Sequence, residues 1–192
     1  MSARKVVAKE LTRSVIMEAA HDLFIREGYQ HVSMRQIAKQ LGYSHGALYY
    51  HFDNKAELFY AMVEQDFQLL NEKLHDVLQQ DLSPKAKLKA ILLGFIEFGL
   101  NNQSQYEVMF MVKDAEVKSY LQEGPNKSYE LFVQALQLCT DKLDVRQAYS
   151  IFLSLHGFVS HFCREVASFD EVHSLAETHV TFIITSIFSP MK

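Results

Sequence analysis

The sequence predicts an all-α protein of about nine helices, in which an N-terminal three-helix region is joined by a long helix to a larger helical part. Three observations support this class. Apolar residues recur at helical spacing along most of the chain, only three prolines and seven glycines interrupt its 192 residues, and a hydrophobic content of 48% is enough for a full core. We expect the two parts to comprise residues 1–55 and 56–192.

The first helix is predicted within residues 9–27, because its apolar positions follow one helical face. These positions are Ile16, Ala19, Ala20, Leu23 and Phe24. Gly28 is expected to end this helix.

The next stretch carries the most specific pattern of the chain. Ser33 and Gln36 can form a capping box at the start of a short helix. Gly42 can end that helix, because glycine adopts the left-handed conformation of a tight turn without steric cost. Ser44 can then cap a second short helix over residues 45–50. Two short helices joined by a glycine-containing turn are typical of a helix-turn-helix.

A long helix is predicted to follow over residues 55–80, with Asp53 or Asn54 as its cap. Its length would be roughly 36–40 Å at a rise of 1.5 Å per residue. A rigid rod in this position could pass movement between the two parts of the protein.

Apolar spacing predicts further helices at residues 83–102, 106–112, 126–141, 145–166 and 170–188. Ser83 and Pro84 suit the start of the first of these, residues 101–104 are predicted as a turn, and Gly124-Pro125 is the clearest break. The last two helices have more apolar surface than one core contact requires. This predicts a homodimer through helices in residues 145–188.

The composition limits where in the cell the protein is expected and whether its cysteines are expected to be oxidised. No apolar run approaches the ~20 residues of a membrane-spanning helix, and the N-terminus lacks the apolar run of a signal peptide. We therefore expect a cytoplasmic protein without a membrane partner. Cys139 and Cys163 have no CxxC spacing, which favours two buried free thiols over a disulfide or a metal site.

The net charge of −4 is unevenly distributed. Residues 1–55 hold eight Lys or Arg against five Asp or Glu, a balance of +3, whereas residues 56–192 hold eleven against eighteen, a balance of −7. The second short helix and its end add hydroxyl and imidazole groups with no carboxylate among them: Ser44, His45, Tyr49, Tyr50 and His51. Such groups in a positively charged segment favour a partner made of phosphates and base edges.

The same stretch resembles the DNA-binding motif of the tetracycline-repressor (TetR) family of bacterial transcription regulators. In that family, a helix with an Ile-Ala pair leads through a Gly-aliphatic-Ser turn into Gly-x-Leu-Tyr-x-His-Phe, followed by Lys and Leu. The matching positions here are Ile37-Ala38, Gly42-Tyr43-Ser44, Gly46-Ala47-Leu48-Tyr49-Tyr50-His51-Phe52, Lys55 and Leu58. Ser33 stands where threonine is usual, and Tyr43 where valine is usual. The motif covers about an eighth of the chain, and the family's domain layout extends the resemblance more loosely over its whole length.

The resemblance implies a ligand-responsive transcriptional regulator, most simply a repressor. It would bind a near-palindromic operator in double-stranded DNA as a homodimer and be released by a small apolar or aromatic effector. The implied DNA-binding residues are Ser33, Arg35, Ser44, His45, Gly46, Ala47, Tyr49, Tyr50, His51 and Lys55.

Roles within this set follow from the resemblance together with side-chain chemistry. Phosphates would be held by Ser33, Tyr49, His51 and Lys55, bases would be faced by Ser44, His45, Gly46 and Ala47, and Tyr50 could do either. Tyr49 and Tyr50 could instead be packing rings, while Leu48 and Phe52 are expected in the core. The basic residues Arg4, Lys5, Lys9 and Arg13 either solubilise the N-terminal tail or contact phosphates or the minor groove, which we favour.

A second, weaker resemblance concerns the larger part. One TetR subgroup has a Trp-x-x-x-His-Gly motif in a late helix and an earlier Tyr-x-x-Met-Phe segment; Tyr106, Met109, Phe110, His156 and Gly157 match, with Phe152 in place of the tryptophan. The candidate ligand-binding residues are Phe95, Phe98, Tyr106, Met109, Phe110, Tyr129, Phe132, Phe152 and His156. This aromatic cluster forms either an effector pocket or a filled core. His156 is either the polar anchor of a ligand or a core histidine bonded to a backbone carbonyl.

Other classes of function have little support in the sequence. There is no G-x-S-x-G, H-E-x-x-H, P-loop or dinucleotide fingerprint, so neither catalytic residues nor a cofactor are predicted. His161 and Glu165 share i, i+4 spacing, but two ligands do not hold a catalytic ion, so no metal site is predicted. A helical protein-interaction module without DNA affinity is the remaining alternative, and the charge distribution argues against it.

Overall fold

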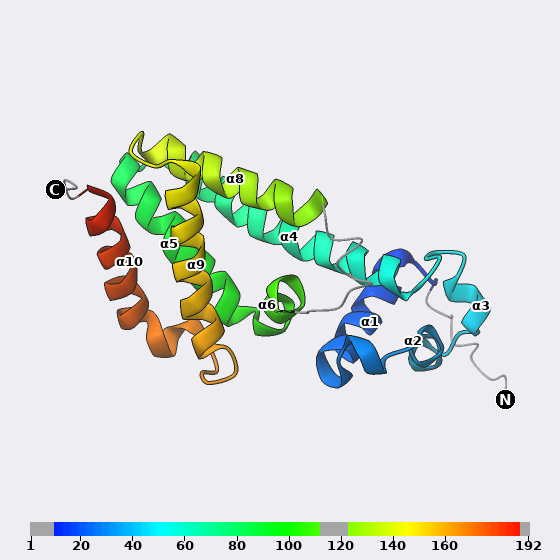
Figure 1. Cartoon of the computed structure of the whole chain (residues 1–192). Helices are drawn as coiled ribbons and strands as arrows, with labels where there is room; N and C mark the ends of the chain where they lie inside the picture. The colour runs from blue at the N-terminus through cyan, green and yellow to red at the C-terminus, as the bar shows by residue number, and fades with distance from the viewer. Residues whose placement is uncertain (1–9, 112–122, 189–192) are drawn as a thin grey trace, which may run out of the picture. The chain divides into compact units, whose positions relative to one another are not determined.

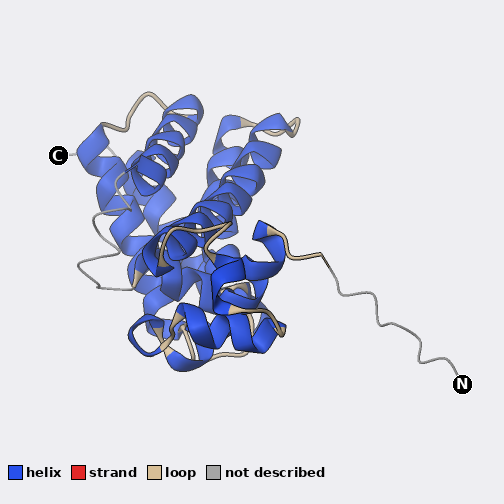
Figure 2. Ribbon diagram, turned by 90° about the vertical axis from the view of Figure 1, so that its right-hand side faces the viewer, coloured by secondary structure: helices blue, strands red, loops and turns tan. Residues whose placement is uncertain are grey.

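The computed structural model describes residues 10–111 and 123–188. Within these residues the chain forms nine α-helices and two short 3₁₀ helices, with no strand (Figure 2). The all-α class and the expected number of helices are thereby confirmed. The described residues form two compact units, one ending at Met62 and one starting at Val63. The functional division predicted at residue 55 stays a prediction.

The first unit contains α1 (Arg13–Glu27), η1 (Tyr29–His31), α2 (Met34–Leu41), α3 (His45–Leu48) and the beginning of α4 (Lys55–Gln79), labelled in Figure 1 where there is room. α1 packs against α2, and α2 packs against α3. The five predicted apolar positions of α1 are the ones that are buried. Phe24, Tyr29 and Phe59 add a ring cluster with centroids 4.8–5.6 Å apart.

α1 begins four residues later than the predicted segment. Thr12 is its N-cap, and the Thr12 hydroxyl accepts a hydrogen bond from the backbone N–H of Val15 at 3.3 Å. Gly28 ends the helix with φ 81°, as expected for a position that favours glycine. The tail residues Arg4, Lys5 and Lys9 lie outside the described residues.

The second unit contains the remainder of α4 and the helices α5 (Pro84–Asn101), α6 (Gln103–Phe110), α8 (Glu123–Cys139), α9 (Val145–Phe162), η2 (Phe169–Val172) and α10 (His173–Phe188). α5 is central to the unit, because it packs against α6, α8, α9, α10 and η2 (Figure 1). Gly99 lies where side chains of α6 and α9 come close to the backbone of α5. A Cβ at Gly99 would lie 2.6 Å from Cγ1 of Val159 and 3.0 Å from the Tyr106 ring.

Several element ends differ from the prediction. α6 starts at Gln103, inside the predicted turn at residues 101–104. Gly124-Pro125 belongs to the first turn of α8 instead of breaking the chain, because the N–H that proline lacks has no helical partner there. α9 ends at Phe162, and Arg164 then adopts a left-handed conformation with φ 70°. The predicted mixed segment at residues 113–124 lies largely outside the described residues.

The two cysteines are free thiols, as predicted, although Cys139 is buried and Cys163 only half-buried. Within the described ranges, no helix is both long and apolar enough to cross a membrane. In the same ranges, histidine, cysteine and acidic side chains form no group of three that could hold a metal ion.

Candidate functional sites: an exposed helix-turn-helix and an aromatic pocket

The helix-turn-helix is fixed by local interactions that the sequence specifies. The Ser33 hydroxyl accepts from the backbone N–H of Gln36 at 3.3 Å, and the Gln36 amide oxygen accepts from the backbone N–H of Ser33 at 2.8 Å. Gly42 ends α2 in the left-handed region, with φ 75°. Leu48 and Phe52 are buried, as predicted, and they anchor α3 and its following turn to the unit.

α3 is two residues shorter than predicted and ends at Leu48. Ser44 occupies the N-cap position, but its side chain makes no capping hydrogen bond. Tyr49 and Tyr50 follow the helix in a turn. Tyr50 is 91% exposed, which excludes the packing-ring alternative for this residue, whereas Tyr49 is 43% exposed and its ring centroid lies 4.9 Å from that of His45.

Most of the candidate DNA-contacting residues lie on the surface of the first unit. The exposed ones are Ser33, Arg35, Ser44, His45, Gly46, Tyr49 and Tyr50, and the half-buried ones are Ala47, His51 and Lys55. A Cβ at Gly46 would meet no atom within 4 Å, so internal packing does not require a glycine there. Close approach of a partner to this backbone stays a prediction.

Arg13, which the sequence groups with the DNA-contacting tail, has internal partners. Its guanidinium lies 3.9 Å from the centre of the Phe52 ring and donates to the backbone oxygen of His51. It also pairs with the Glu57 carboxylate at 3.3 Å, and Glu57 in turn accepts from the backbone N–H of Asp53 at 2.5 Å. Arg13 therefore ties the start of α1 to the turn that follows α3.

Lys55 is also bonded within the first unit. Its ammonium group donates to the backbone oxygen of Tyr29 at 2.9 Å and lies 4.1 Å from the centre of the Tyr29 ring. These contacts join the start of α4 to η1. A phosphate contact by Lys55 stays a prediction, and it would compete with these internal bonds.

The second unit contains a cavity of about 660 Å³, lined by α4, α5, α6, α8 and α9 and the residues next to them. Its volume falls within the range of roughly 300–1,000 Å³ that is usual for small-molecule sites. Five of the nine candidate ligand-binding residues line it: Phe95, Phe110, Tyr129, Phe132 and Phe152. These five side chains therefore line a cavity, and the binding of an effector in it stays a prediction.

The other four candidates, Phe98, Tyr106, Met109 and His156, do not line this cavity. His156 is bonded to side chains instead: its Nδ1 lies 2.6 Å from the Tyr106 hydroxyl and its Nε2 3.4 Å from the Ser160 hydroxyl. These side-chain partners replace the expected backbone carbonyl, and the anchor role stays a prediction. Burial lowers the pKa of His156 and raises the pKa of Tyr106, so both groups are neutral at pH 7.

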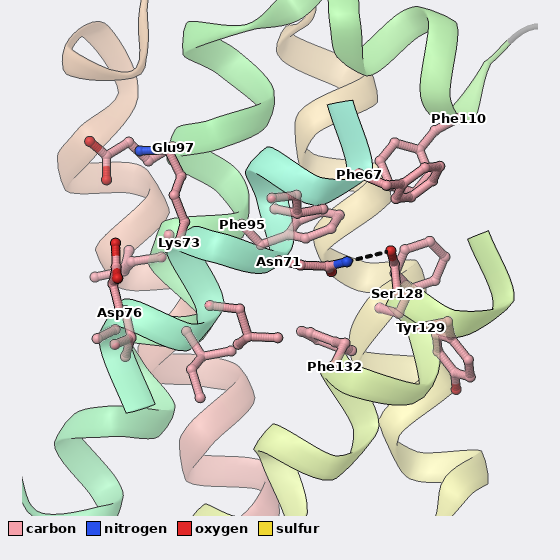
Figure 3. A pocket seen from close by; sticks show the side chains of 18 of the residues that line it. Phe67, Asn71, Lys73, Asp76, Phe95, Glu97, Phe110, Ser128, Tyr129 and Phe132 are labelled. Carbon is pink, nitrogen blue, oxygen red and sulfur yellow. Dashed lines mark hydrogen bonds between the residues drawn. The ribbon is translucent and has the colours of Figure 1, made fainter. Parts of the chain in front are cut away.

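The polar groups of the cavity were not found from the sequence. The Asn71 amide donates to the Ser128 hydroxyl at 3.0 Å. Figure 3 shows this bond across the cavity, with Lys73, Asp76 and Glu97 gathered at one side and labelled aromatic rings at the other. All three charged residues are exposed, which makes them part of the rim.

The apolar stripe of α4 carried the signal that could have located these groups. Phe67, Leu70, Leu74 and Val77 follow helical spacing in the sequence, and all four line the cavity. Asn71 interrupts this stripe one position after Leu70. A polar residue at the edge of a predicted buried face is a candidate for a polar contact.

α9 and α10 leave large apolar side chains exposed. Phe182 is 72% exposed, Leu175 50% and Leu153 48%. Gly157 is also exposed, and a Cβ there would meet no atom within 4 Å. Ile183, in contrast, is only 5% exposed and belongs to the core of its own unit.

Comparison with known proteins agrees with the geometry of the helix-turn-helix. The model of a family described as bacterial regulatory proteins, tetR family, matches residues 16–62, which include α2, the turn and α3. By this match, residues 16–62 form a tetR-family regulatory segment. The description of this family is one of regulatory proteins. The Trp-x-x-x-His-Gly subgroup stays a prediction.

A relative in Staphylococcus aureus (strain USA300), an HTH-type transcriptional regulator, is 36% identical over 116 residues. The match covers 54% of this chain and 62% of the relative, so this chain aligns with less than two thirds of that protein's length.

Solved structures share the fold over nearly the whole chain. The fatty acid degradation regulator FadR from Bacillus halodurans has a TM-score of 0.78 at 16% identity, covering 95% of this chain and all of that one. FadR from Bacillus subtilis, solved in complex with stearoyl-CoA, has a TM-score of 0.74 at 17% identity, covering 94% and 100%. The ketosteroid transcriptional regulator KstR2 of Mycobacterium tuberculosis has a TM-score of 0.67 at 17% identity, covering 97% and 100%. At these identities the likeness is one of fold alone.

Proposed function

We propose that this tetR-family protein is a ligand-responsive transcriptional repressor that binds a near-palindromic operator as a homodimer. The observation that carries the proposal is the surface of residues 44–51, which exposes hydroxyl and imidazole groups and contains no carboxylate. Such groups suit phosphate oxygens and the base edges of the major groove. In this proposal His45 reads bases, whereas the hydroxyl of Tyr49 holds a phosphate.

A band-shift assay with the DNA upstream of its own gene, against bulk competitor DNA, tests the proposal. Binding should be specific and should weaken steeply with salt, because phosphate contacts release counterions. His45→Ala should change the ranking of operator variants, while His75→Ala, an exposed histidine in the second half of α4, should keep it. Equal displacement by bulk and specific DNA would contradict specific operator binding. An unchanged ranking in His45→Ala would contradict base recognition by His45.

Tyr49→Phe tests the proposed phosphate contact on the same surface independently. Removing the hydroxyl should weaken binding to all DNA sequences alike, because a phosphate contact carries no sequence information. Affinity that is the same as for the unchanged protein, across sequences and salt concentrations, would remove Tyr49 from the interface.

The homodimer is proposed to form through α9 and α10. The exposed Leu153, Leu175 and Phe182, beside the open surface at Gly157, support this, since two such helices from each copy can form a four-helix bundle. Two copies related by a two-fold axis would present their α3 helices to major grooves about 34–36 Å apart.

Sedimentation of charged variants tests this interface. Phe182→Glu and Gly157→Glu should give monomers, because a charge buried without a partner costs several kcal/mol. Ile183 is unsuitable, since a charge there would disrupt the core of its own unit. Leu138→Glu is a matched control: Leu138 is 74% exposed on α8, outside the proposed interface, so the dimer should persist. Intact dimers in both α9 and α10 variants would place the interface elsewhere.

The effector is proposed to bind in the cavity of the second unit. α4 supports a link to DNA binding, because this one helix runs from Lys55 to Gln79 and lines the cavity in its second half. The stearoyl-CoA bound to the FadR structure from Bacillus subtilis gives a precedent for an effector with a long apolar portion. An effector can release DNA only if it favours the non-binding state, and DNA must then weaken effector binding by the same factor. Measuring both affinities, each with and without the other partner, tests this reciprocity.

A further inference from the structure

We infer that the cavity binds an elongated, mainly apolar molecule with an uncharged hydroxyl or carbonyl group that hydrogen-bonds to Asn71 and Ser128. This inference rests on the proposed effector site and specifies the chemistry of its ligand. It follows from the length of the cavity, from its buried polar pair and from the distribution of charge along its lining.

The cavity is long relative to its volume. Its lining follows α4 from Phe67 to Gln80, a distance of about 20 Å at a rise of 1.5 Å per residue. A volume of about 660 Å³ spread over that length leaves room for a single chain or a narrow ring system. The aromatic rings of the lining favour an apolar body, because the hydrophobic contribution scales with the apolar area buried.

The Asn71–Ser128 pair gives this apolar cavity one fixed polar position. Ser128 is only 7% exposed and Asn71 is half-buried, and their bond uses one amide hydrogen and one lone pair of the hydroxyl. The amide oxygen of Asn71 and the hydroxyl hydrogen of Ser128 can each make a further hydrogen bond. A ligand that covers this pair with hydrocarbon alone would remove its hydrogen bonds to water and provide none in their place, which is unfavourable. A ligand hydroxyl can satisfy both groups, and a carbonyl can accept from Ser128.

The charges of the lining argue against an anionic ligand. Among the described lining residues Lys73 is the only cation, and it shares the exposed rim with the carboxylates of Asp76 and Glu97 (Figure 3). A carboxylate carried into the aromatic part would find no cation among these residues, and a buried charge without a partner is strongly disfavoured. A carboxylate left at the rim would gain little, because water and salt screen exposed ion pairs. An uncharged polar group therefore fits the cavity best.

The first part of the test locates binding, using the full chain without DNA. Nile red, a neutral carbonyl-containing dye that fluoresces in apolar surroundings, serves as the probe. Gly94 lines the cavity, and a Cβ there would meet no atom within 4 Å, so Gly94→Phe should fill the cavity without a clash at Cβ. We expect dye affinity to fall at least tenfold in Gly94→Phe and to stay within twofold in Gly94→Ala. Unchanged binding in Gly94→Phe would overturn the assignment of the ligand to this cavity.

The second part tests the polar pair and the charge preference by displacement of the dye. Dodecan-1-ol should displace it at a concentration at least tenfold lower than dodecanoate, which has the same chain length. Ser128→Ala and Asn71→Leu should each raise the concentration of dodecan-1-ol that displaces Nile red. That increase should be at least threefold larger than the increase for dodecanoate. Ser150→Ala, which removes an exposed hydroxyl of α9 outside the cavity, is the control and should change neither. Circular dichroism checks that each variant is folded, and Ser128→Ala carries the test should Asn71→Leu unfold.

Two results of the displacement experiment would also overturn the inference. Dodecanoate binding as tightly as dodecan-1-ol would replace the uncharged class with an anionic one, and an unaltered preference in both pair variants would remove Asn71 and Ser128 from recognition. If the protein binds these ligands as expected but does not bind an operator, the result contradicts only the function proposed for the helix-turn-helix. Ligand binding that has no effect on the operator would contradict the proposed control of DNA binding and leave the ligand class standing.

Discussion

In the first unit, His45 and Tyr50 belong to an exposed surface, whereas in the second unit Tyr106 and His156 are hydrogen-bonded to each other in a largely buried network. Exposed polar groups contribute little to folding, because water satisfies them before and after the chain folds. A buried pair behaves differently, since removal of one partner leaves the other without its bond in a medium of low dielectric. The comparison teaches that the surroundings of a polar side chain, more than its type, separate candidate contact residues from structural ones.

The same distinction applies to the cations of the first unit and the amide of the second. Arg13 and Lys55 lie next to the helix-turn-helix, yet both are bonded to groups of their own unit. Asn71 and Ser128 are bonded to each other but also line a cavity, so they combine a structural bond with access to a ligand. Sequence proximity to a motif is therefore weaker evidence for function than a polar group that faces a surface or a cavity.

The largest contrast is expected between two nearby rings of the first unit. Phe52→Ala should lower the free energy of unfolding by about 3–5 kcal/mol, because Phe52 is 1% exposed and supports the Arg13 guanidinium. Tyr50→Ala should change it by no more than about 0.5 kcal/mol, because Tyr50 is 91% exposed. Urea denaturation followed by circular dichroism measures both. Similar losses in the two variants would contradict the assigned surroundings.

The next largest effect is a pH dependence of the free energy of unfolding, which is expected from Asp66 in the second unit. Burial raises the pKa of Asp66 to about 7 from an ordinary value of 3.8, so between these values the folded chain retains a proton that the unfolded chain has lost. Stability from this group should therefore fall as the pH rises from 4 to 7, by on the order of 2 kcal/mol between pH 5 and 7.

Comparison with Asp66→Asn isolates that contribution. His21 and His156 act in the opposite sense, because burial lowers the pKa of each and their contribution to stability rises with pH. Thermal unfolding of the variant should consequently show less loss, or a gain, between pH 5 and 7 when it is measured beside the unchanged protein. Parallel curves for the two proteins would show that Asp66 titrates normally.

A smaller loss is expected when one hydroxyl is removed from the buried network. Tyr106→Phe should destabilise the protein by about 1–3 kcal/mol, because Nδ1 of His156 loses the partner at 2.6 Å. Tyr49→Phe removes the same atom from a surface residue and should cost less than about 0.5 kcal/mol. Thermal unfolding at pH 8 compares the two variants. Equal midpoints would mean that the Tyr106 hydroxyl contributes no net stability.

The first unit could be predicted largely from the sequence, because its defining interactions are local. The capping box of Ser33 and Gln36, the left-handed Gly42 and the buried Leu48 and Phe52 all depend on residues within a short stretch. The contacts of Arg13 could not be predicted in the same way, because they join residues 38 and 44 positions apart.

The second unit was harder to predict, because its cavity depends on how five helices pack. Helical spacing gave the buried faces, but a buried aromatic can line a cavity, as Phe95 does, or lie away from it, as Phe98 does. The partner of His156 comes from α6, 50 residues away, and no periodic pattern specifies such a pair. Asn71 and Ser128 are similarly separated by 57 residues, so their bond could not be inferred before the packing was known.

The smallest predicted effect compares two glycines within α5. Gly94→Ala should stabilise the protein by about 0.5–1 kcal/mol, because alanine favours a helix interior and its Cβ would meet no atom within 4 Å. Gly99→Ala should have the opposite sign, because its Cβ would lie 2.6 Å from Val159 and the resulting displacement costs more than the helical preference returns. The two substitutions have the same intrinsic helix propensity, so their difference in thermal unfolding measures packing alone. A gain in both variants would mean that the contact between α5 and α9 can open without cost, and a loss in both would mean that the space beside Gly94 is occupied.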